Sequence, residues 1–161
     1  MPLNIVKFRE ILNIVLINLI VFFALISIHE IGHSAAGMLL GCRYEKSVLM
    51  DYNFAGPYTE MYCSNVNGLL ISISSLLITS FFSALFLFLR APTRNLFLIG
   101  LGLSVIFSSI DISVAASLQS MMYPMVSLGF FVTAVGEYFI ASYYAKNNFA
   151  LDLLDIEAEF S

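Results

Sequence analysis

The sequence has few charged residues, no tryptophan, only two cysteines and only two histidines. Charged residues make up 11% of the 161 residues and hydrophobic residues 60%. Because soluble domains carry about 25% charged residues, this composition favours a membrane protein that forms one compact unit. Lysine and arginine together number 7 and form no cluster, which argues against a nucleic-acid partner. Cys42 and Cys63 are too few for a disulfide scaffold, and both a mutual disulfide and two buried thiols remain open.

Four long apolar stretches predict transmembrane helices. They cover residues 11–40, 69–89, 96–118 and 124–145. Each reaches the roughly 20 residues that a helix needs to cross a hydrocarbon layer of about 30 Å, and backbone groups in lipid must be satisfied within the segment. The predicted fold is therefore an all-α integral membrane bundle of about four helices. The first stretch is too long for the apolar region of a signal peptide, so we expect it to be retained.

The connections between these stretches differ in length. Residues 41–67 form the one long loop, in which residues 47–52 have the composition of a short strand. Residues 147–161 are acidic, and we expect a short surface helix or disorder there. We therefore divide the chain into a transmembrane core, residues 1–146, and this C-terminal tail. A cytoplasmic N-terminus places five of the 7 basic residues on the cytoplasmic side, which agrees with the positive-inside rule for a multi-pass membrane protein.

Both histidines lie in the first apolar stretch, within the motif His29-Glu30-Ile31-Gly32-His33. Residues i and i+4 share one face of a helix, so both imidazoles can reach one metal ion. Glu30 follows the first histidine, where it can take a proton from a metal-activated water. An ionised group near the bilayer centre costs at least about 2.5–3.5 kcal/mol, which a bound cation would offset. The pattern predicts a zinc site with Glu30 as general base; the alternative is a helix-packing cluster satisfied by hydrogen bonds.

The third zinc ligand has to come from elsewhere in the chain. A catalytic zinc site usually has three protein ligands and an open fourth position, and no third histidine is present. Asp111 is the best candidate, because it lies about 23 Å along the third helix while His29 lies about 27 Å along the first, which runs in the same direction. Glu137 and Glu60 remain alternatives. If Asp111 is not a ligand, we expect it to contact hydroxyls of the second helix, such as those of Ser72, Ser75 or Thr79.

These features resemble the site-2 protease family of intramembrane zinc metalloproteases. The resemblance rests on the motif at residues 29–33, the small residues 34–37 after it, and the helix order up to Asp111. It covers roughly residues 11–118. Asp111 is followed by Ile112, whereas the family has glycine there, and the asparagine and proline that precede the family's aspartate are missing.

The resemblance implies an activity and a role for each residue. His29, His33 and Asp111 would bind one zinc ion and Glu30 would activate water, while residues 48–52 would be a strand that holds unwound substrate. The expected function is a membrane-embedded zinc endopeptidase whose partners are a transmembrane protein substrate and the lipid bilayer. Two alternatives stay open: a metal-binding or regulatory membrane protein without proteolysis, and a zinc hydrolase that acts on lipid. Glu30 discriminates between them, because metal binding alone does not need it.

Overall fold

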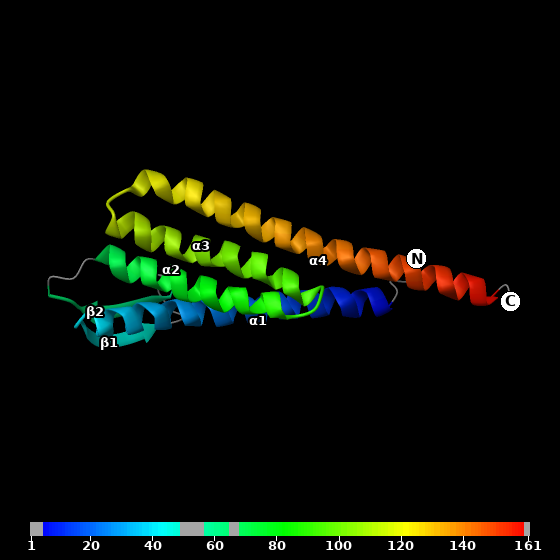
Figure 1. Cartoon of the computed structure of the whole chain (residues 1–161), viewed down its shortest axis with the longest axis horizontal. Coiled ribbons are helices and arrows are strands. Elements are labelled where there is room, and N and C mark those ends of the chain that lie inside the picture. Colours follow the sequence, from blue (N-terminus) through cyan, green and yellow to red (C-terminus); the bar gives the residue numbers. More distant parts are fainter. Residues whose placement is uncertain (1–4, 49–56, 65–67, 160–161) are drawn as a thin grey trace.

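The computed structural model describes the backbone of residues 5–48, 57–64 and 68–159, and the side chains of residues 11–48, 57–64 and 68–146. Four long helices dominate the described part (Figure 1): α1 (Ile5–Leu39), α2 (Gly68–Ala84), α3 (Leu96–Ala115) and α4 (Met122–Glu159). Short 3₁₀ turns η1 (Leu85–Phe88) and η2 (Thr93–Asn95) lie between α2 and α3, and η3 (Gln119–Met121) lies between α3 and α4. All four helices are long and apolar enough to cross a membrane, so the predicted fold class is confirmed.

The interior of the bundle is rich in small hydroxyl side chains, and large apolar side chains lie on its outside. Phe23, Leu39 and Phe88 are exposed. Transmembrane helices associate through small residues, because lipid tails surround large apolar side chains as favourably as protein does. This distribution agrees with helices that face lipid. Among the described side chains, the buried hydroxyls all come from α2 and α3: Ser72, Ser75, Thr79, Ser83, Ser104, Ser108, Ser109 and Ser113.

Glycines allow the helices to approach one another closely. α2 packs against α1 and α3, and α3 packs against α4. A Cβ atom added at Gly32, between the two histidines, would lie 3.0 Å from Cα of Ser75, so α1 and α2 meet almost backbone to backbone. A Cβ atom at Gly102 of α3 would lie 2.5 Å from the carbonyl oxygen of Gly129 in α4. Larger residues at either glycine would push these helix pairs apart.

The long loop between α1 and α2 forms an antiparallel hairpin of strands β1 (Arg43–Val48) and β2 (Tyr58–Tyr62). The hairpin lies beside the C-terminal half of α1 (Figure 1) and contacts it through both strands. A disulfide between Cys42 and Cys63 closes its base, which answers the question that the sequence left open. The strand expected at residues 47–52 overlaps only the end of β1, and residues 49–56 lie outside the described residues.

α4 extends well beyond the apolar span predicted at residues 124–145. The apolar part of this region, Gln119–Lys146, is followed by further helix that ends only at Glu159. Figure 1 shows this end projecting past the rest of the bundle. The acidic residues therefore continue α4 instead of forming a separate surface helix, which agrees with their content of good helix formers such as Leu, Ala and Glu.

Candidate metal centre

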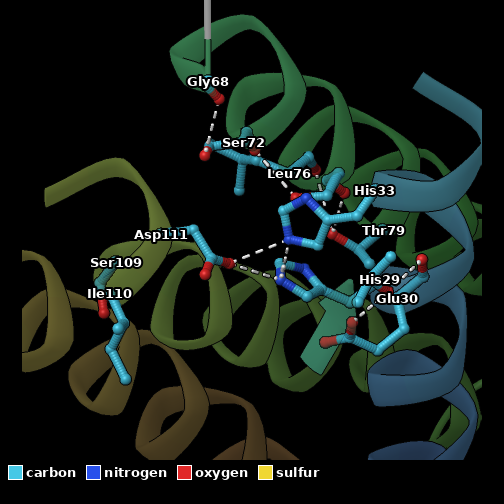
Figure 2. Close-up of polar contacts among 12 residues, drawn as sticks. His29, Glu30, His33, Gly68, Ser72, Leu76, Thr79, Ser109, Ile110 and Asp111 are labelled. Atoms are coloured by element: carbon cyan, nitrogen blue, oxygen red, sulfur yellow. Dashed lines mark hydrogen bonds and ion pairs between the residues drawn. The ribbon is translucent and has the colours of Figure 1, made fainter. Parts of the chain in front are cut away.

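α1 and α3 bring both histidines and Asp111 to one point (Figure 2). His29 and His33 lie one turn apart on α1, and both rings point toward Asp111 of α3. The two rings meet edge to face, with their centroids 4.6 Å apart. His29 is 3% exposed, whereas Asp111 is partly exposed. The similar membrane depths expected for His29 and Asp111 thus correspond to a direct contact in the structure.

The three inward-pointing atoms form a nearly equilateral triangle. Nε2 of His29 lies 2.9 Å from Oδ2 of Asp111, and Nε2 of His33 lies 3.1 Å from the same oxygen. The two Nε2 atoms are 3.1 Å apart. Ligand atoms at about 2.0–2.1 Å from a tetrahedral zinc ion lie about 3.3 Å from one another. The triangle is therefore close to the dimensions of three zinc ligands.

Hydrogen bonds alone cannot satisfy this triangle. An imidazole nitrogen that carries a proton cannot also accept one, so at most two of the three contacts can be hydrogen bonds at the same time. A cation can accept a lone pair from all three atoms. His29, His33 and Asp111 are also the group of potential ligands that lies within 4.8 Å of one another in the described part of the chain. Their donor set of two imidazoles and one carboxylate suits zinc. Zinc binding at this site stays a prediction.

The two alternative third ligands have other partners. Glu137 of α4 accepts a hydrogen bond from the side-chain amide of Asn18, about three turns before His29 on α1. Glu60 of β2 forms an ion pair with Lys46 of β1, with Nζ and Oε2 3.2 Å apart. The hydrogen bond to Glu60 raises the pKa of the Lys46 ammonium. Neither acid belongs to the triangle, and Asp111 does.

The hydroxyls considered as contacts of Asp111 are bonded within their own helix. Ser72 donates to the carbonyl oxygen of Gly68, and Thr79 donates to that of Ser75. Ser75 itself donates to the carbonyl oxygen of Ser72. The hydrogen bonds of Asp111 go instead to the two histidines. The alternative in which these α2 hydroxyls hold Asp111 is therefore not what the structure shows.

A cleft of about 360 Å³ opens beside the triangle. Glu30 of the motif helix lines it with His33 and Asp111, so a molecule in the cleft would touch both the candidate base and the candidate metal site. α2, α3 and β2 form the remaining walls. Pro57, which directly precedes β2, also lines the cleft. The other lining residues from these elements are Tyr58, Thr59, Met61, Gly68, Ile71, Ser72, Val114 and Ala115.

The structure adds Thr59 to the candidate site. Glu30 is only 4% exposed, and its carboxylate oxygen Oε2 accepts a hydrogen bond of 2.6 Å from Oγ1 of Thr59. Sequence reasoning missed this threonine, because no spacing rule links a loop residue to a helical residue 29 positions earlier. Strand β2, which the sequence analysis did not predict, places Thr59 next to Glu30.

Fold and site together define a membrane-type helical bundle with a three-residue candidate metal centre beside a cleft. Comparison of the chain with protein families, with curated proteins and with solved structures finds no match. The function proposed below is therefore argued from the chain's own residues and their geometry, together with the motif.

Proposed function

We propose that this chain is an intramembrane zinc metalloendopeptidase that hydrolyses peptide bonds in or near transmembrane segments of other proteins. The observation that carries the proposal is the convergence of His29, His33 and Asp111 on one point, with Glu30 lining the same cleft. A metal-storage or structural site has no need of a carboxylate at that position. The resemblance of the motif to the site-2 protease family supports the same activity.

Each residue has a defined part in this reaction. Held by His29, His33 and Asp111, zinc would supply a Lewis acid and lower the pKa of a bound water toward about 7. Glu30 would take the proton from the attacking water and deliver it to the leaving amine of the cleaved peptide. Because a helix protects its own carbonyl groups by hydrogen bonding, the substrate must be extended where it enters the cleft.

Metal analysis of purified protein tests the zinc site. We expect about one zinc ion per wild-type chain and a large loss of zinc in Asp111→Ala, because one of three ligands is removed. Glu137→Ala is the matched control, since it also removes an intramembrane acid but one that lies outside the triangle. Equal zinc content in the two variants would contradict the assignment of Asp111.

Cleavage of a reporter protein with a single transmembrane segment, in detergent or vesicles, tests the activity. General-base catalysis typically contributes about 10²–10⁴-fold, so Glu30→Gln should cleave at least about 100-fold more slowly than wild type while it keeps its zinc. Full activity of Glu30→Gln would rule out the general-base role. Zinc binding without cleavage by wild type would favour a regulatory metal protein, and release of fatty acid from the vesicle lipids would favour a lipid hydrolase.

A further inference from the structure

The hairpin places a hydroxyl group directly on the carboxylate of Glu30. Thr59 Oγ1 lies 2.6 Å from Glu30 Oε2 and 3.3 Å from the carbonyl oxygen of the same residue. The shorter distance is within the range of strong hydrogen bonds to ionised oxygen. Glu30 is almost fully buried, so its carboxylate has lost most of its hydration. The hydrogen bond from Thr59 compensates for part of this loss.

The Thr59 hydroxyl is the donor in this hydrogen bond, and the hydroxyls of Ser47 and Ser34 lie nearby. Ser47 Oγ lies 2.8 Å from Thr59 Oγ1, and Ser34 donates to the carbonyl oxygen of Glu30 at 2.9 Å. A hydroxyl has one proton, and an ionised carboxylate can only accept. Thr59 therefore donates its proton to Glu30 and can only accept from Ser47, whose own proton can go either to Thr59 or to Ser34 Oγ, 3.1 Å away. The threonine hydroxyl thus cannot turn away from Glu30 without losing this hydrogen bond.

Strand pairing determines where this hydroxyl lies. Ser47 of β1 and Thr59 of β2 are paired directly across the hairpin, so their side chains project from the same face. The Lys46–Glu60 ion pair and the Cys42–Cys63 disulfide hold the same two strands together. The backbone of the hairpin thus positions Thr59, and Thr59 in turn restricts the side-chain torsions of Glu30.

We infer that Thr59 is a positioning residue that holds the Glu30 carboxylate at the cleft in the orientation needed for proton transfer. This role rests on the proposed peptidase function. A glutamate side chain with several rotatable bonds otherwise samples orientations in which its carboxylate does not face the reacting water. Thr59 also lines the cleft, but in this role it acts through Glu30, so its loss lowers the turnover number without removing the metal.

Kinetics of three variants test this inference. Thr59→Val keeps the shape of the side chain and removes the hydroxyl, and we expect kcat to fall about 10-fold with KM and zinc content unchanged. Thr59→Ser restores a hydroxyl and should recover most of the lost rate. Thr133→Val is the matched control, because the Thr133 hydroxyl donates only to Gly129 within α4, and it should keep wild-type kinetics. Unchanged kcat in Thr59→Val, or equal losses in Val and Ser variants, would overturn the positioning role.

A second measurement needs no catalytic activity and therefore separates failure of this inference from failure of the proposed function. Thermal unfolding is measured for wild type, Thr59→Val, Glu30→Ala and the double variant. Since one hydrogen bond can be lost only once, Thr59→Val should lower the melting temperature less in the Glu30→Ala background than in wild type. Strictly additive losses would show that Thr59 and Glu30 do not interact, whether or not the protein is a peptidase.

Discussion

Replacing both Cys42 and Cys63 with serine releases the base of the hairpin that carries Thr59. The disulfide joins residues 21 positions apart. The loop-closure entropy removed by a link of this length corresponds to about 3 kcal/mol at 25 °C. Because 1.4 kcal/mol is a factor of ten in an equilibrium constant, opening of the hairpin should become more favourable by up to about 150-fold. The zinc content should not change, since the triangle belongs to α1 and α3.

Hydrogen exchange read by mass spectrometry measures this opening. Amides of β1 and β2 should exchange faster in the double serine variant, whereas amides of α3 should keep their wild-type rates. Adding a reductant should accelerate hairpin exchange in wild type to the level of the variant and leave the variant unchanged. Hairpin exchange that stays at the wild-type rate after both treatments would refute the idea that the disulfide holds the strands in place. Loss of zinc together with the disulfide would show that hairpin and metal centre are not separate units.

Two further predictions concern packing and orientation. Gly32→Val should lower the melting temperature by the equivalent of about 1–3 kcal/mol, because its Cβ would lie 3.0 Å from Cα of Ser75. Gly68→Ala is the control, since its added Cβ would approach Ala115 only to 3.8 Å, and equal melting temperatures would contradict the close contact of α1 and α2. With a cytoplasmic N-terminus, a membrane-impermeant maleimide should label Ser120→Cys in intact cells and Thr93→Cys only after permeabilisation. The reverse labelling pattern would show that the charge-based orientation is wrong.

The four helices could be predicted from the sequence because each apolar stretch is long enough to span a bilayer by itself. The contact between His29 and Asp111 could be predicted too, since helix rise converts residue positions into depths. Both inferences depend on distances measured along regular helices. Apolar length does not predict where a helix ends. α4 continues to Glu159 because helix propensity persists after the apolar residues stop.

The hairpin and its contact with Glu30 could not be predicted in the same way. β2 has the sequence Tyr-Thr-Glu-Met-Tyr, which lacks the strongly apolar alternation of a buried strand. Its register against β1 is set together with the disulfide, which depends on the approach of two cysteines across the loop. Thr59 reaches Glu30 only after this pairing has formed, so no local pattern around residue 59 reveals the contact.

The hydroxyl groups inside the bundle bear on how its helices can separate. Thr79 and Ser83 of α2 donate to carbonyl oxygens of their own helix, and Ser104 of α3 does the same. A sideways displacement of α2 away from α3 would therefore break none of these hydrogen bonds. It would give up only dispersion contacts between small side chains, which lipid chains can replace. Most hydroxyls of these two helices are thus satisfied within their own helix before the helices meet. The exception is the buried hydroxyl of Ser108 on α3, which has no hydrogen-bond partner among the described residues.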